Sequence, residues 1–125
     1  MKTVSIIIPI YNSEKYLPDL FACLGKMTFI EGDEILLIDN GSKDRTNELC
    51  KEQVKKNSVY KYLYYAEKAD SYAARNYGVK NATGEILVFT DSDCKPTPKW
   101  LDRIRTNIQF GIFIAVSYTH LRAHE

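Results

Sequence analysis

Residues 85–93 read EILVFTDSD, an apolar run followed by two aspartates that stand two positions apart. Two earlier stretches have the same form: VSIIIPIYN at residues 4–12 and EILLIDNGS at residues 34–42. Uninterrupted apolar runs of this length are typical of strands covered on both faces in a parallel sheet. The polar residues after each run should therefore meet at the carboxyl edge of one sheet, where open α/β folds bind ligands.

Strand-like and helix-like segments alternate along the chain. The predicted strands cover residues 4–9, 34–39, 59–65 and 86–90, and the predicted helices cover residues 14–27, 45–56, 71–81 and 99–108. Asn12 or Ser13 is placed to cap the first helix, in which Pro18 fits only the first turn, and Asp44 is placed to cap the second. This order predicts an α/β fold, an open and mostly parallel sheet with helices on both faces.

The composition is that of one ordinary globular domain. The 125 residues include 17 basic and 16 acidic side chains, so the net charge of +1 argues against nucleic acid as a partner. The cysteines Cys23, Cys50 and Cys94 form no C-x-x-C pair, which predicts neither disulfides nor a zinc site and favours a reducing cytoplasm. No run approaches the about 18 apolar residues of a transmembrane segment, and peripheral attachment at the inner face of the membrane stays an alternative.

The end of the sequence breaks the alternation. The run FGIFIAV at residues 110–116 fits either a fifth strand or the end of the native reading frame. From Val116 onward, VSYTHLRAHE resembles translated adapter or vector sequence. We therefore expect one structural unit at residues 1–115, a non-native or disordered tail at residues 116–125, and a missing native continuation. His120 and His124 have the spacing of a helical metal site, but without the glutamate of HExxH they are not expected to form one.

Asp91 and Asp93 form the sharpest group of candidate site residues. Residues two apart in extended chain project to the same side, so both carboxylates can face one small volume. A bound divalent cation would relieve their repulsion, with phosphate oxygens and water as its other ligands, which indicates a metal diphosphate site. The alternative is a solvated turn that caps the following helix.

Three further residues have a functional and a structural interpretation. Asp39, followed by Asn-Gly, could accept hydrogen bonds from a base or ribose, or could form an Asx turn. The ring of Tyr11 could stack on a base or pack as an ordinary side chain. Arg75 could bind phosphate or a carboxylate, or lie exposed on its helix.

Four motifs together resemble the family 2 glycosyltransferases, whose catalytic domain has the GT-A fold. They are VSIIIPIYNSEKYLPDLF at residues 4–21, EILLIDNGSKDRT at 34–46, SYAARNYGVKNATGEILVFTDSDC at 71–94 and PTPKWL at 96–101. They follow the order and approximate spacing of the family over almost all of residues 3–108. Four ordered motifs are far more specific than any one of them.

The resemblance implies a site for a nucleoside diphosphate sugar and a divalent metal. The implied nucleotide-binding residues are Pro9, Tyr11, Asn12, Asp39, Arg75, Asp91 and Ser92. Asp93 would bind Mn2+ or Mg2+ directly, and Asp91 would bind the ribose or a metal-bound water. The metal would neutralise charge on the leaving nucleoside diphosphate, and transfer in this family is usually inverting.

The chain departs from the family pattern at several positions. Asn40 stands where the second residue of an acidic pair is usual, Arg45 replaces a residue that is often glycine, and EKADSY at residues 67–72 lacks a glycine found in some relatives. The family places its general base downstream of the two aspartates. Glu125 lies in the tail that is expected to be non-native, so no catalytic base is assigned.

The resemblance therefore implies an enzyme that transfers a sugar from a UDP-linked donor to a glycan, lipid or cell-wall acceptor, with residues 1–115 as its nucleotide-sugar-binding part. Two alternatives stay open. The chain could bind nucleotide and metal without turnover, or it could be a sugar nucleotidyltransferase. The second would need a glycine- and lysine-rich phosphate loop after the first strand, and that loop is absent from the sequence.

Overall fold

The fold is a three-layer α/β structure built on five parallel strands. A computed structural model of the chain describes residues 1–108 and the backbone of residues 114–116. The elements are β1 (Val4–Ile10), α1 (Leu17–Leu24), β2 (Glu34–Asp39), α2 (Thr46–Lys56), β3 (Tyr60–Tyr64), α3 (Ser71–Asn81), β4 (Ile86–Phe89), α4 (Trp100–Asn107) and β5 (Ile114–Val116). The strand order is β3-β2-β1-β4-β5. The predicted fold class, an open parallel sheet with helices on both faces, is confirmed.

The register of the central strands brings three strand ends to one edge. Ile10 at the end of β1 lies opposite Asp39 at the end of β2. On the other side of β1, Ile7 lies opposite Phe89 at the end of β4, and the Thr90 N–H donates to the Ile7 carbonyl at 3.3 Å. The segments after β1, β2 and β4 therefore start close together, as the sequence predicts.

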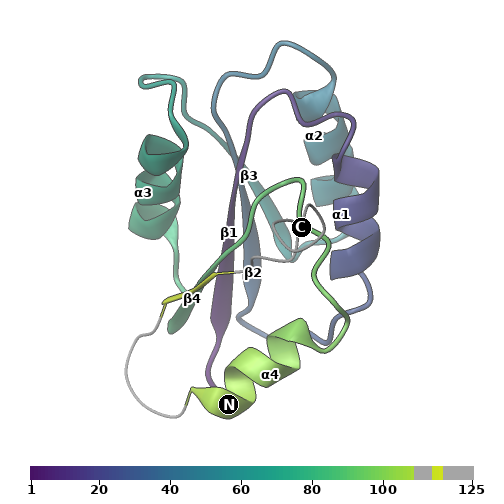
Figure 1. Cartoon of the computed structure of the whole chain (residues 1–125), viewed down its shortest axis with the longest axis vertical. Helices are drawn as coiled ribbons and strands as arrows, with labels where there is room; N and C mark the ends of the chain where they lie inside the picture. Colours follow the sequence, from purple (N-terminus) through teal and green to yellow (C-terminus); the bar gives the residue numbers. More distant parts are fainter. Residues whose placement is uncertain (109–113, 117–125) are drawn as a thin grey trace, which may run out of the picture.

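The two faces of the sheet are covered by different helices (Figure 1). One face of β1, carrying Ile6 and Ile8, packs with α1, α2 and α4, whose buried contributions include Leu20, Cys50 and Leu101. The other face packs against α3 and forms a smaller core of Ile7, Leu36, Ile38, Ala74 and Phe89. Because helices cover both faces, consecutive positions of the central strands are buried, which explains the apolar runs of β1, β2 and β4.

Gly78 lets α3 lie close to the sheet. A Cβ atom at this position would stand 2.5 Å from Cγ2 of Ile7 and 3.3 Å from Cγ1 of Ile38. No side chain larger than hydrogen fits there unless the Ile7 side chain, the helix or the strand shifts. The close approach fixes the position of α3, and with it the residues that α3 directs toward the carboxyl edge.

Two clusters that contain buried charged side chains connect segments at the opposite, amino-terminal edge. Arg105 of α4 pairs with Asp33, and both side chains are almost fully buried. The Arg105 guanidinium also donates to the Lys2 carbonyl at 2.6 Å. Glu34 accepts from the Ser5 hydroxyl and from the Lys61 ammonium, each at 2.6 Å. Burial alone would raise the pKa of Glu34, but these hydrogen bonds outweigh it and lower the pKa.

The element boundaries follow the predictions except in the first helix. The helix predicted at residues 71–81 has those bounds, whereas the one predicted at residues 14–27 is shorter and spans Leu17–Leu24. The Tyr16 and Leu17 N–H groups both donate to the Ser13 carbonyl, so residues 13–16 form a tight turn before the helix. Neither Asn12 nor Ser13 caps it, and Pro18 lies in its first turn.

Two expectations concern the end of the chain. β5 shows that a fifth strand forms at residues 114–116, across the boundary expected at residue 115. Residues 109–113 and 117–125, with His120, His124 and Glu125, lie outside the described residues. In the described part of the chain, no helix has the length and apolar character needed to span a membrane.

Candidate functional site

The segment after β1 is bound to the segment after β2 by hydrogen bonds in both directions. The Asn12 N–H donates to the Ser42 hydroxyl at 2.9 Å, and the Asn12 side-chain oxygen accepts from the Lys43 N–H at 2.7 Å. Asn12 has a φ of 46°, in the left-handed region that asparagine tolerates. Asn12 therefore connects the loop after β1 to the loop after β2.

Ser13 and Asp44 extend this connection. The Ser13 N–H donates to the Thr46 hydroxyl at 2.7 Å, and the Asp44 carboxylate accepts from the N–H groups of Glu14 and Thr46. The Ser13 hydroxyl also lies 2.9 Å from the hydroxyl of Ser92, in the segment after β4. Three loops that are distant in the sequence therefore form one connected edge.

Asp39 is fully buried beneath this edge. Its Oδ1 accepts from the N–H groups of Gly41 and Ser42, at 3.1 and 2.8 Å, which is the Asx turn considered from the sequence. Its Oδ2 accepts from the Tyr62 hydroxyl at 2.6 Å. Burial, followed by this donation to Asp39, raises the pKa of Tyr62. Gly41 has a φ of 96°, so the turn depends on glycine.

Asn40, the next residue, points its amide nitrogen to the backbone. Its Nδ2 donates to the carbonyls of Tyr65 and Lys68, each at 2.8 Å. Both amide hydrogens are used in this way, so Oδ1 is the group left to accept a hydrogen bond from a ligand. The same two bonds hold the loop between β3 and α3 in place.

The aspartates after β4 lie beside α3. The Arg75 guanidinium donates to Oδ1 of Asp91 at 2.8 Å, and its carbon lies 5.7 Å from the ring centre of Tyr72. Ligand atoms of Asp91, Asp93 and Cys94 lie within 4.8 Å of one another. Two carboxylates at this separation fit a hard divalent cation that takes its other ligands from phosphate and water. The thiol of Cys94 is a softer donor and suits such a cation less well.

These segments enclose a cavity of about 580 Å³, here called the edge cavity. It is lined by Pro9, Ile10, Tyr11, Ser13, Tyr16, Asn40, Ala69, Asp70, Ser71, Asp91, Ser92 and Asp93. Five predicted site residues, namely Pro9, Tyr11, Asp91, Ser92 and Asp93, line it, whereas Asn12, Asp39 and Arg75 do not. Of these three, Arg75 bonds the lining residue Asp91, whereas Asn12 and Asp39 both bond Ser42 in the loop after β2.

Sequence reasoning missed several lining residues. Asn40 belongs to the polar residues expected at the carboxyl edge, but as a departure from an acidic pair it is not among the predicted binding residues. Asp70 accepts from the Ala73 N–H at 2.6 Å as the cap of α3, a role that its place before SYAAR could have suggested. Tyr16, 43% exposed, carries no signal that separates it from the other tyrosines.

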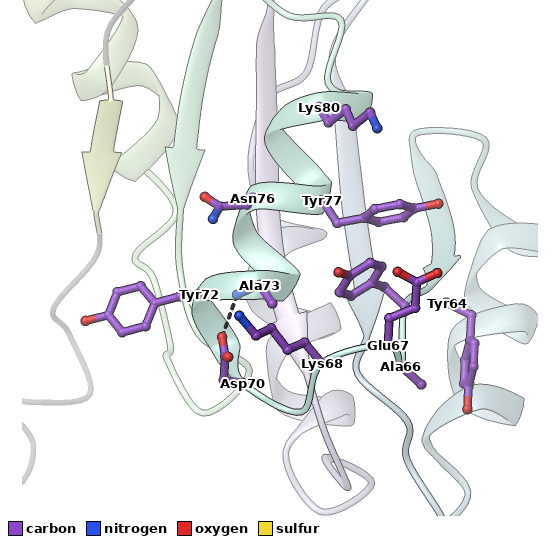
Figure 2. A pocket seen from close by; sticks show the side chains of 11 residues that line it. Tyr64, Ala66, Glu67, Lys68, Asp70, Tyr72, Ala73, Asn76, Tyr77 and Lys80 are labelled. Atoms are coloured by element: carbon purple, nitrogen blue, oxygen red, sulfur yellow. Dashed lines mark hydrogen bonds between the residues drawn. The ribbon is translucent and has the colours of Figure 1, made fainter.

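A second cavity, of about 920 Å³, lies between β3 and α3 and is here called the tyrosine cleft. Its wall includes Tyr64, Tyr65, Tyr72 and Tyr77, and the rings of Tyr65 and Tyr77 stack at 4.7 Å. Figure 2 shows Tyr72 and Tyr77 projecting from opposite sides of α3, so the rings do not converge on one ligand. Asp70 borders both cavities. Of the two, the edge cavity is the one that brings together the predicted site residues.

The family model described as Glycosyl transferase family 2 matches residues 5–120. The chain belongs to glycosyl transferase family 2. The Haloferax volcanii glycosyltransferase AglE is 37% identical over 101 residues, which cover 80% of this chain and 33% of AglE. The chain thus spans about a third of the length of this relative.

Solved structures give the same assignment. The crystal structure of residues 1–349 of Staphylococcus aureus TarS superimposes with a TM-score of 0.72 at 30% identity, covering 85% of this chain and 32% of that one. The complex of the same TarS fragment with UDP-GlcNAc gives a TM-score of 0.71. A mannosyltransferase from Pyrobaculum calidifontis shares the fold, with a TM-score of 0.68 at 23% identity. The GT-A fold expected from the sequence resemblance is confirmed.

Proposed function

We propose that residues 1–115 form the nucleotide-sugar-binding part of a glycosyltransferase that transfers a sugar from a UDP-linked donor to a glycan, lipid or cell-wall acceptor. The observation that carries the proposal is the edge cavity, in which Asp91 and Asp93 face the ends of β1 and β2 in a member of this family. TarS, a poly(ribitol-phosphate) β-N-acetylglucosaminyltransferase that was solved with UDP-GlcNAc, supports a UDP-linked donor. A cytoplasmic location, where activated sugars are made, goes with this proposal.

Different residues in and around the edge cavity bind or position different parts of the donor. Tyr11, 54% exposed, offers a ring face on which the base stacks. Oδ1 of Asn40 accepts a hydrogen bond from an N–H group of the base, because its amide hydrogens are already donated. The buried Asp39 keeps the turn that presents Asn40, through its bonds to Gly41 and Ser42.

Asp93 and Asp91 hold the divalent cation, Mn2+ or Mg2+. When bound, the cation supplies Lewis-acid stabilisation of the negative charge on the leaving diphosphate. The hydroxyl of Ser92 is held against Ser13, which keeps the two carboxylates at the level of the β1 segment. Displacement at the sugar carbon by the acceptor hydroxyl inverts that carbon, as is usual in the family, and the acceptor proton passes to a base outside the residues assigned here.

Calorimetric titration of UDP into the 125-residue chain, with and without Mn2+, tests the donor site. We expect metal-dependent binding of UDP that exceeds binding of GDP. Asp93→Asn should abolish this binding, whereas Asp102→Asn, the same change on α4, should leave it intact. Absence of UDP binding to a chain shown by circular dichroism to be folded would refute the donor site.

Hydrolysis or transfer distinguishes the enzyme from a binding module. UDP released from UDP-GlcNAc in the presence of acceptor polymer would establish turnover. Tight UDP binding without any release, in a protein that includes the rest of the relatives' length, would favour the binding module.

A further inference from the structure

Arg75 does not line the edge cavity, although it bonds one of the carboxylates that do. Its guanidinium donates to Oδ1 of Asp91 at 2.8 Å, from the side of α3. The side chains are 29% and 36% exposed, so the pair is partly shielded from water. A shielded guanidinium beside a carboxylate changes the field at that carboxylate more than a fully exposed one would.

Helix packing and a ring contact set the position of Arg75. α3 is pressed against the sheet at Gly78, where a Cβ would stand 2.5 Å from Ile7. The guanidinium also lies over the ring of Tyr72, at 5.7 Å from its centre. Arg75 is therefore held beside Asp91 by the fold, which distinguishes it from a surface arginine that meets a carboxylate by chance.

The charge balance of this group bears on cation binding. Asp91 and Asp93 carry two negative charges, and the ion pair with Arg75 offsets one of them. Without the nucleotide, a divalent cation is therefore attracted less strongly by Asp91 and is repelled by Arg75. A nucleoside diphosphate adds negative charge and oxygen ligands at the same place. The cation therefore binds most tightly when the nucleotide is also bound.

We propose that Arg75 is a positioning residue that compensates Asp91 and thereby makes divalent-cation binding depend on the nucleoside diphosphate. This role rests on the proposed donor site and deepens it. Arg75 lowers the affinity of the site for free cation, and the negative charge of the nucleotide raises that affinity again. The cation then enters as a complex with the diphosphate of the donor.

Electron paramagnetic resonance of free Mn2+ measures this dependence without any turnover. In the wild-type chain, we expect Mn2+ to bind at least about tenfold more tightly with saturating UDP than without it. In Arg75→Gln, Mn2+ alone should bind about tenfold more tightly than in wild type, and the effect of UDP should shrink. Arg75→Lys keeps the charge and should restore weak binding of Mn2+ alone.

Lys80→Gln is the matched control, because it removes one positive charge from the same helix at the tyrosine cleft. It should leave Mn2+ affinity unchanged. Equal Mn2+ affinity in wild type and folded Arg75→Gln, or weaker affinity in the variant, would overturn the proposal. So would Arg75→Lys behaving as Arg75→Gln does, since orientation rather than charge would then matter.

The outcomes separate this role from the donor site itself. If Arg75→Gln does not fold, a wild-type chain that binds UDP but takes Mn2+ equally well without it overturns the role of Arg75. If UDP does not bind while Arg75→Gln still tightens Mn2+ binding, the donor site is wrong and the role of Arg75 in cation binding stands.

Discussion

At the scale of single residues, the candidate site depends on side chains whose hydrogen bonds hold the backbone in place. Both carboxylate oxygens of Asp39 accept hydrogen bonds, from the N–H groups of Gly41 and Ser42 and from the Tyr62 hydroxyl. The residue is fully buried. Its neighbour Asn40 lines the edge cavity instead. A buried carboxylate thus shapes the turn, and the residue next to it faces the edge cavity.

Gly41 tests how far that turn depends on one residue. Its φ of 96° is strained for an L side chain, while a Cβ would meet only ordinary contacts, such as Ala66 at 3.4 Å. Gly41→Ala should therefore lower the free energy of unfolding by about 1–2 kcal/mol through backbone strain alone. Urea denaturation measures the loss, and Gly41→Asn should lose less because asparagine tolerates positive φ. An alanine variant as stable as wild type would show that the turn relaxes.

At the scale of elements, α3 connects the core to the site. Its buried side packs through Ala74 and Gly78, its cap is Asp70, and its Arg75 reaches Asp91. The position of the helix against the sheet therefore sets the position of one wall of the edge cavity.

Gly78→Ala should move this helix. The new Cβ would stand 2.5 Å from Cγ2 of Ile7, and such overpacking costs about 1–3 kcal/mol, more than the about 1 kcal/mol that alanine gains over glycine in a helix. We expect a net loss of stability in thermal melts. Val79→Ala, at a position that is 40% exposed on the same helix, should change stability little. A melting temperature of Gly78→Ala at or above wild type would contradict the close packing.

At the scale of the whole molecule, the stability of the fold depends on pH through two buried groups of the core. Burial, followed by the charges of Asp39 and Asp44, raises the pKa of Cys50 from 9.0 to about 12. Burial raises the pKa of Tyr60 from 10.0 to about 12. Both groups lie in the core that α1 and α2 share with the sheet. Both stay protonated in the folded chain at pH values where the unfolded chain loses those protons.

The sign of the effect follows from these raised pKa values. The folded state binds more protons between about pH 9 and 12, so stability is full below pH 9 and declines as pH rises through that window. Urea denaturation from pH 7 to 11 should show the decline beginning near pH 9. Cys50→Ala should be less stable at pH 7 but show a shallower decline. A decline equally steep in the variant would remove Cys50 as a cause.

By itself, the sequence determined the parallel sheet, the order of its elements and the edge of the sheet at which the candidate site residues lie. Apolar runs such as EILLI and EILVF are covered on both faces, and Asp91, Ser92 and Asp93 had to lie at the carboxyl edge because β4 ends just before them. These features are local, since they depend on hydrophobic pattern and on the position of a residue after its strand.

Only the tertiary structure decided which side chains face the cavity and which support it. Asp39 turns inward because Tyr62, 23 residues away, donates to it, and Asn40 is oriented by carbonyls 25 and 28 residues away. Arg75 lies behind Asp91 because α3 packs where Gly78 allows, and Arg105 is buried because Asp33 receives it. Each orientation is set by a partner that is distant in sequence, so no local pattern contains it.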